Sequence, residues 1–427
     1  MNTIKFLNSS SVSEETFAAD MASIRSRLFS AGICWTDDIQ GQFEVGKPFR
    51  VILYTRNVNI DFKNPMTKEC NGLVIGYDND WKLLAMPQGA FCTNKISMKK
   101  LNDIYSAGNY DVYEVLDATI LTLYFYDNEW KVSSTKGYDI GGTEMVDGMT
   151  FIGAIQDLMA TKYKSFRLED LKQNCSYTIA LRHSKYHLFD ETKHMANRTR
   201  HVPRAGVDMN SYLMVMSVAD TTTGTYVGKH VAGLPSQNPI AKRDQNVHTL
   251  TMYARSAFAK YAKAHRLQNF KYKPLYGYIL RAKHKSVPDE YSTIYIESEL
   301  YKSIKLALYK DNHAIRALNY NKLVVQMVLN HERYEQFRIM FQQFESHFKL
   351  IEDTIEGIAA EVASRIVEQG ADDSKDVRMT EEESQVNPQL LNDLTEQFKN
   401  EPDITSGIIK DALYSKRYAE YLFSLIN

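Results

Sequence analysis

Residues 110–142 read YDVYEVLDATILTLYFYDNEWKVSSTKGYDIGG, and β-branched and aromatic side chains dominate this stretch. Two such runs, 111–126 and 130–137, flank Asp127 and Asn128. Asp and Asn are favoured in tight turns because they tolerate a left-handed backbone. The pattern therefore predicts one long strand, a short turn, and a second strand that pairs back on the first.

Similar runs of β-branched and aromatic residues occur on both sides of this hairpin. Further strand-like runs are bounded by Asn, Asp and Gly, and they occupy residues 49–55, 72–78, 81–87, 176–183, 211–220, 276–282 and 291–297. Helical spacing separates some of these runs, at 96–107, 148–163 and 248–265. This order of elements predicts an α+β domain with antiparallel sheets.

The chain beyond residue 298 has a helical pattern. One apolar stripe recurs at three-to-four spacing and consists of Ile351, Ile355, Ile358, Val362 and Ile366. Residues 370–388, GADDSKDVRMTEEESQVNP, are polar and acidic and predict a flexible linker before short helices near 389–400 and 405–426. We expect three parts: a helical or extended lead-in at 1–48, the α+β domain at 49–298, and an all-helical C-terminal domain at 299–427.

The composition is that of an ordinary globular protein. The 427 residues are 44% hydrophobic and 24% charged, with a formal net charge of −1. Four scattered cysteines without a Cys-x-x-Cys pair argue against a disulfide framework, and His183 and His187 have no convincing third metal ligand. The N-terminus lacks a signal-peptide core, and no run approaches the roughly 18 apolar residues of a membrane span. We expect a soluble cytoplasmic protein with no metal site and no membrane contact.

Three motifs, in a fixed order, resemble those of phage-type ATP-dependent RNA ligases, which belong to the covalent nucleotidyltransferase superfamily. Glu69-Cys70-Asn71-Gly72 stands where that family has Glu-Cys-Arg-Gly. Glu114-Val115-Leu116-Asp117-Ala118 stands where it has Glu-Lys-x-Asp-Gly, and residues 213–227, LMVMSVADTTTGTYV, resemble a later strand and turn. The resemblance spans residues 49–305 and implies a nucleotidyltransferase-like domain built on antiparallel sheets.

The resemblance also implies that the catalytic groups have been lost. In that family a lysine attacks the α-phosphate of ATP, carboxylates place Mg²⁺, and further lysines neutralise the phosphates. Other residues occupy the matching positions here: Val115 for the nucleophile, Ala118 for the glycine of the motif, Ala180 (or Thr178) for a metal carboxylate, Tyr276 for a glutamate, and Tyr295 and Glu297 for two lysines. Asn71 and Ala90 likewise replace an early arginine and lysine.

Three residues that the resemblance places near the nucleotide cleft are retained: Glu114, Asp117 and Lys136. Asp117 fits either a ribose contact or a structural carboxylate. Lys136 fits either a nucleotide contact or a solvated hairpin lysine. A divergent active enzyme would need a displaced nucleophile, either Lys136 or Lys68, and the motif around Lys68 has a spacing one residue too long.

Basic residues gather in residues 242–285, where the only acid is Asp244 and tyrosines and phenylalanines are interleaved. In proteins that bind single-stranded nucleic acids, basic side chains contact the phosphate backbone and aromatic rings stack on unpaired bases. The predicted RNA contacts are Arg255, Lys260, Lys263, Arg266, Lys271, Lys273 and Arg281. The same pattern also fits a solvated helix face, or a surface that meets the acidic residues 352–403 within or between chains.

These observations favour a catalytically inactive RNA-ligase-like protein that binds RNA or a protein partner and needs no cofactor. The resemblance implies a phage or viral gene and a place in the host cytoplasm. Two alternatives remain: an active, divergent RNA ligase that uses ATP and Mg²⁺, and a structural protein that forms homo-oligomers through its helical tail.

Overall fold

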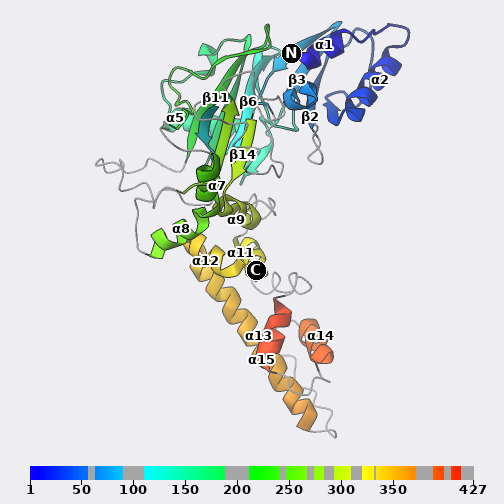
Figure 1. Ribbon diagram of the computed structural model, residues 1–427. Coiled ribbons are helices and arrows are strands. Elements are labelled where there is room, and N and C mark those ends of the chain that lie inside the picture. The colour runs from blue at the N-terminus through cyan, green and yellow to red at the C-terminus, as the bar shows by residue number, and fades with distance from the viewer. Residues whose placement is uncertain are drawn as a thin grey trace. The chain divides into compact units, whose positions relative to one another are not determined.

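The computed structural model describes residues 1–55, 63–89, 110–187, 211–240, 247–266, 274–282, 293–308, 320–330, 333–371, 388–398 and 405–414 (Figure 1). They form two units, Met1–Tyr301 and Lys302–Asn427. The first unit contains the sheets, and the described part of the second unit is helical.

The first sheet consists of four short strands, and a tight turn joins the last two. Its antiparallel order is β1 (Ile33–Asp37), β2 (Phe49–Thr55), β3 (Asn71–Asp78) and β4 (Asp80–Ala85). Asn79 has φ 63°, a left-handed conformation that lets β3 turn directly into β4. Helices α1 (Asn2–Asn8) and α2 (Phe17–Ser30) bury Leu7 and Met21 against the face that carries Phe49 and Trp81. The predicted lead-in at 1–48 therefore supplies β1 and the helical cover of this sheet.

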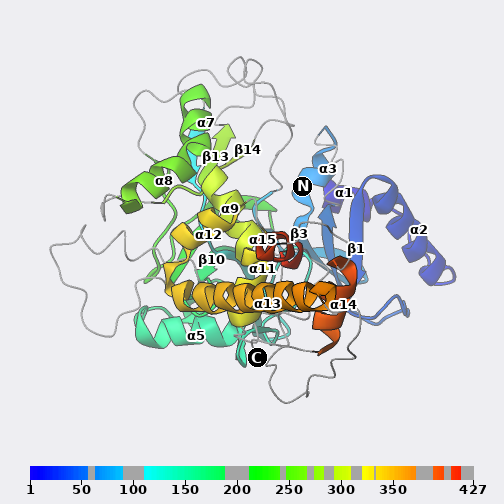
Figure 2. The same cartoon turned by 90° about the horizontal axis from the view of Figure 1, so that it is seen from below.

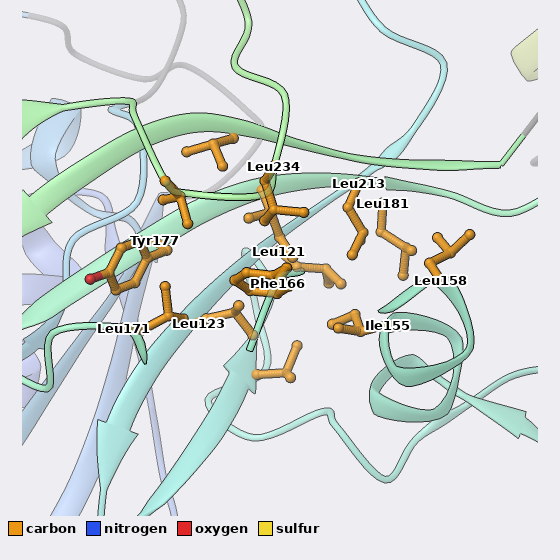
Figure 3. Close-up of a cluster of buried hydrophobic side chains, with 14 of the residues drawn as sticks. Leu121, Leu123, Ile155, Leu158, Phe166, Leu171, Tyr177, Leu181, Leu213 and Leu234 are labelled. Carbon is orange, nitrogen blue, oxygen red and sulfur yellow. The ribbon is translucent and has the colours of Figure 1, made fainter. Parts of the chain in front are cut away.

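The second sheet carries an extensive apolar core. Its antiparallel order is β12 (Thr225–Gly228), β11 (Tyr212–Asp220), β10 (Cys175–Arg182), β6 (Thr119–Tyr126) and β7 (Glu129–Ser133). Asp127 and Asn128 both have positive φ, 52° and 58°, so the predicted turn between β6 and β7 is confirmed. Figure 3 shows side chains of β6, β10 and β11 pointing toward Ile155 and Leu158 of α5 (Phe151–Thr161), which covers one face.

The third sheet contains only the first part of the strand predicted at 111–126. Its antiparallel order is β14 (Thr293–Glu297), β13 (Gly277–Ala282) and β5 (Tyr110–Glu114). The single strand predicted at 111–126 is wrong, because the chain breaks at 115–118 and sends β5 and β6 into different sheets. The sequence pattern does not indicate this break, because β5 and β6 both have apolar residues that are buried, although in different cores. Helix α7 (Val247–Arg255) packs Val247 and Leu250 against one face of this sheet, and α8 (Ala257–Arg266) follows.

Short elements complete the first unit. They are α3 (Pro65–Glu69), β8 (Glu144–Val146), β9 (Met149–Thr150) and the 3₁₀ turn Leu168–Asp170. The Asn64 side chain caps α3 by accepting from the Met66 amide at 3.0 Å, and proline follows at the first helical position.

Helices make up the second unit. They are α11 (Tyr320–Val328), α12 (Tyr334–Met340), the 3₁₀ turn Gln342–Phe344, α13 (Glu345–Ala371), α14 (Pro388–Phe398) and α15 (Ser406–Leu413), while α9 (Glu299–Leu308) spans the boundary. The predicted stripe from Ile351 to Ile366 is buried along α13, which contacts α11, α14 and α15 (Figures 1 and 2). Most of the linker predicted at 370–388 lies outside the described residues.

The predicted fold class is confirmed: antiparallel sheets with packed helices, followed by C-terminal helices. The division at residues 48 and 298 stays a prediction. In the described part of the chain, no helix has the length and apolar character needed to cross a membrane.

Candidate functional site

A cavity of about 340 Å³ lies where the second and third sheets face each other. On β13 and β14, Tyr278 and Ile294 face α7, so their neighbours Ile279 and Tyr295 face the cavity. On β6, Leu121 and Leu123 face α5, so Ile120 and Thr122 face the cavity. The described residues that line the cavity are Asn71, Pro87, Gln88, Val115, Leu116, Ala118, Ile120, Thr122, Ser134, Thr135, Met216, Ile279, Tyr295 and Tyr301.

The cavity wall includes the predicted position of the missing nucleophile. Val115 lies in the crossing between β5 and β6, only 8% exposed, and its amide donates to the Gly277 carbonyl at 3.0 Å. Ala118 lines the same wall. No charged side chain of the described residues lines this cavity. It is therefore neutral at the point where adenylyl transfer needs an amine.

Tyrosines occupy the side where the resemblance expects lysines. Tyr295 and Tyr301 line the cavity, and burial raises the pKa of both phenols, so both stay neutral. The Tyr295 hydroxyl donates to Glu297 Oε1 at 3.0 Å. Glu297 itself is outside the lining, and Tyr276 is buried with its ring centroid 5.4 Å from that of Tyr301.

The predicted metal-carboxylate position lies beside the cavity. Ala180 pairs across the strands with Ile120, and Thr178 pairs with Thr122. Cross-strand partners share a face, so Ala180 and Thr178 lie on the cavity side of β10 without lining the cavity. Neither side chain can bind a metal as a carboxylate would. Among the described residues, no group of three or more His, Cys, Asp or Glu is placed to hold a metal ion.

Asp117 is buried behind the cavity wall. Its carboxylate accepts from Arg182 Nη1 at 2.5 Å, and its carbonyl accepts from the same nitrogen at 2.7 Å. Both residues are fully buried, and the second guanidinium nitrogen donates to the His187 carbonyl at 3.4 Å. Burial lowers the pKa of His187 to about 4, so its ring is neutral near pH 7. This contact anchors the 115–118 crossing to β10.

The Glu69-Cys70-Asn71-Gly72 motif lies next to the cavity, and Asn71 is part of the cavity lining. Gly72 has φ +93°, and a Cβ there would lie 2.8 Å from the Ser134 carbonyl oxygen, so β3 begins in close contact with the segment after β7. Asn71 donates from Nδ2 to the Gln88 carbonyl at 3.0 Å. Sequence segments far apart are thus brought together around one cavity, as the resemblance implies.

The two other retained residues lie outside the lining. Glu114 shares with Val112 the β5 face that turns toward α7, and its carbonyl accepts from Gln237 Nε2 at 2.8 Å. Lys136 is exposed, with Nζ 5.9 Å from the centroid of the Tyr54 ring. Lys68 is half-buried on α3 and also outside the lining.

The structure divides the predicted basic segment. Arg255, Lys260 and Lys263 are exposed on α7 and α8, and α7 packs on the face of the third sheet away from the cavity. Arg281 alternates with the buried Leu280 on β13 and therefore faces the second sheet. The side chain of Arg266, and all of Lys271, Lys273 and Ala90, lie outside the described residues.

The described side chains that line the cavity do not fit ATP with Mg²⁺ as a covalent nucleotidyltransferase would hold them. A triphosphate and its metal need cations and carboxylates in contact with them. The neutral side chains that line this wall supply neither.

Several sequence relatives of the chain are proteins of African swine fever virus. A protein named "Putative RNA-ligase" from African swine fever virus (isolate Tick/Malawi/Lil 20-1/1983) is 22% identical over 324 residues, which cover 71% of this chain and 69% of that protein. Its counterpart in the Badajoz 1971 Vero-adapted strain is 22% identical over 321 residues, covering 70% and 68%. No protein-family model matches the chain.

Solved ligase structures resemble the chain only distantly. An archaeal ATP-dependent RNA ligase (form 1) gives a TM-score of 0.38 at 11% identity, covering 78% of this chain and 80% of that one. An ATP-dependent DNA ligase from Aquifex aeolicus, with a name marked as putative, gives 0.36 at 9% identity, covering 76% and 80%.

Proposed function

We propose that this RNA-ligase-like protein of the nucleotidyltransferase type is catalytically inactive and binds RNA without transferring an adenylyl group. The observation that carries the proposal is the neutral cavity: Val115 stands in its wall, and no charged side chain of the described residues lines it. The sequence relatives named as RNA ligases support the choice of RNA as the partner.

Adenylyl transfer to a lysine places strict demands on a site. An amine must lie beside the α-phosphate, and preorganised charges must stabilise the negative charge of the transition state. Lys136 and Lys68 are the alternative nucleophiles, and neither lines the cavity. An active enzyme would have to bring one of them into the wall and also supply the missing charges.

The exposed face of α7 and α8 supplies an RNA-binding surface. Lys260 Nζ lies 4.4 Å from the centroid of the Tyr253 ring, and that ring is 37% exposed. Arg255 and Lys263 are exposed on the same pair of helices. Cations for the phosphates and an exposed ring for a base are the combination that single-stranded RNA requires.

Charge reversal on this face should weaken RNA binding. We expect the double variant Lys260→Glu, Lys263→Glu to bind a labelled single-stranded oligoribonucleotide roughly 10-fold more weakly, a loss of about 1.4 kcal/mol. Losing two phosphate contacts should also flatten the slope of log K against log salt by about 1.4. Fluorescence anisotropy at several salt concentrations measures both quantities.

A matched control separates this surface from overall charge. Lys82 and Lys164 are exposed on other parts of the first unit, so Lys82→Glu, Lys164→Glu gives the same change in net charge. The control should bind RNA nearly as well as the unchanged chain. Equal losses in both double variants would mean that α7 and α8 are not the binding surface, and no RNA binding at all would refute the proposal.

A further inference from the structure

A second cavity, of about 420 Å³, adjoins the first, and Gln88 and Met216 line both. Tyr113, Arg281 and Thr293 reach it from the third sheet, and Ser217 and Tyr226 reach it from the second. The remaining lining residues are Gly89, Gly228 and Lys229. Of these lining residues, only Arg281 was predicted from the sequence to contact RNA, and the resemblance assigns no ligand to the cavity.

Two cations converge on the cavity around one aromatic ring. The Arg281 guanidinium carbon lies 4.7 Å from the centroid of Tyr113, and Lys229 Nζ lies 5.3 Å from the same centroid. Lys229 also donates to the Gln237 carbonyl at 2.8 Å, which fixes its position. Among the described residues no acid lines this cavity, although Asp111 stands opposite Arg281 across the strands and attracts its charge.

Two buried polar side chains in the lining have polar atoms without a partner. Gln88 and Ser217 are each only 7% exposed, and Gln88 Nε2 and Ser217 Oγ make no hydrogen bond to the residues that the structure describes. Gln88 Oε1 accepts from Arg281 Nη2, which leaves the amide nitrogen of Gln88 to donate. An unsatisfied buried donor costs about 1 to 3 kcal/mol, so a ligand that accepts from it is favoured.

The cost of burying Arg281 points to the same kind of ligand. Burial lowers the pKa of Arg281, because desolvation penalises the charged form, yet a guanidinium stays protonated near pH 7. An anion in the cavity would offset this desolvation. The fork of guanidinium donors matches phosphate oxygens in particular.

An exposed ring beside the cations favours a nucleotide over a simple anion. Tyr226 is 47% exposed, while its hydroxyl donates to the Pro87 carbonyl at 2.6 Å and so holds the ring in place. A fixed, exposed ring is a stacking surface for a base. The cavity volume also lies within the range of small-molecule sites, about 300 to 1,000 Å³.

We propose that this second cavity binds one nucleotide of a single-stranded RNA, with its phosphate on Arg281 and Lys229 and its base against Tyr226. Gln88 Nε2 and Ser217 Oγ donate the remaining hydrogen bonds to the phosphate oxygens. The proposal deepens the proposed function and rests on it, because the ligand is part of the RNA. It adds a site on the opposite face of the third sheet from α7.

The test compares matched variants of the full chain. Lys229→Gln removes one cation, and Ser217→Ala removes a hydroxyl that has no partner and should leave the melting temperature unchanged. Lys162→Gln is the control, because Lys162 Nζ also donates to a carbonyl, that of Ser211 at 2.7 Å, and lies 6.0 Å from the Tyr163 ring centroid. Lys162 does not line the cavity. The probes are a labelled single-stranded oligoribonucleotide, AMP and inorganic phosphate.

We expect Lys229→Gln to weaken RNA binding roughly 10-fold to 100-fold and Ser217→Ala to weaken it about 3-fold to 10-fold. Lys162→Gln should bind as the unchanged chain does, and AMP should compete better than inorganic phosphate. If RNA binds all variants equally, the second cavity is not the site, and RNA binding itself still stands. If the chain binds AMP through Lys229 but no RNA, the phosphate site stands and the proposed RNA function fails. Binding of none of the three probes overturns both.

Discussion

Replacing Asp117 with alanine should lower the free energy of unfolding by about 3 to 5 kcal/mol, because Arg182 would then be a buried charge without its carboxylate. Both side chains are fully buried, and Nη1 lies 2.5 Å from Oδ2. The contact ties the 115–118 crossing to β10, so its loss should also loosen the wall that carries Val115. Urea unfolding followed by tryptophan fluorescence measures the change.

An exposed ion pair provides the control for this measurement. Glu44 and Lys47 form a surface pair, with side chains 56% and 68% exposed. Glu44→Ala should change the free energy of unfolding by less than about 1 kcal/mol. The double variant Asp117→Ala, Arg182→Met should recover part of the lost free energy of unfolding, since it also removes the buried charge that has no partner in the single variant. If Asp117→Ala lowers the free energy of unfolding no more than Glu44→Ala does, the Asp117–Arg182 pair does not stabilise the 115–118 crossing.

Restoring the missing lysine should not restore the chemistry. We expect Val115→Lys to form a lysyl–AMP bond at least about 10³-fold more slowly than an active RNA ligase, because the groups that would stabilise the transferring phosphate are still missing. The new amine would also sit in a neutral, mostly buried wall, where desolvation opposes its charge. Quenched-flow labelling with ATP and Mg²⁺ measures the rate.

Val115→Met serves as its companion variant, since it adds bulk at the same point without a charge. Val115→Met should stay unlabelled, Val115→Lys should be labelled no faster than the limit given above, and Val115→Lys should lose more stability than Val115→Met. Rapid and stoichiometric labelling of Val115→Lys alone would mean that the rest of a working site is intact. The substitution at Val115 would then be an isolated loss.

Local patterns predicted the strands and turns well. The turn at Asp127 and Asn128 follows from residues that tolerate a left-handed backbone, and the structure gives both a positive φ. The stripe along α13 follows from helical spacing, and its members are buried. These features depend on neighbours in the sequence, so a single chain suffices to find them.

The break between β5 and β6 could not be predicted in this way. Residues 111–126 form one strand-like run, and only the tertiary structure shows that its halves join different sheets. The buried partner of Asp117 is Arg182, which lies 65 positions later in the chain. Apart from Asp117, residues 115–118 include no residue type that is typical of turns, so the sequence does not indicate that the strand ends there.

The two cavities were only partly predictable. The resemblance singled out Val115, Ala118 and Tyr295, and the structure brings all three into one lining. It did not single out Gln88, Ser217 or Lys229, because isolated polar residues near strand ends carry no signal until the sheets are placed. The basic segment singled out Arg281 as an RNA contact. Only the alternation on β13 indicates which face of the sheet Arg281 occupies, and that clue is weak because Ile279 and Leu280 are both apolar.

Incubation of the unchanged full-length chain with ATP labelled at the α-phosphate and Mg²⁺, followed by denaturing electrophoresis, tests most directly whether the ligase chemistry is gone. An active RNA ligase must run beside it. We expect no covalent label on the chain at any time at which the control is fully labelled, since no described lysine lines the cavity at Val115. Label that survives denaturation would show a working nucleophile and contradict the proposal of an inactive RNA-binding protein.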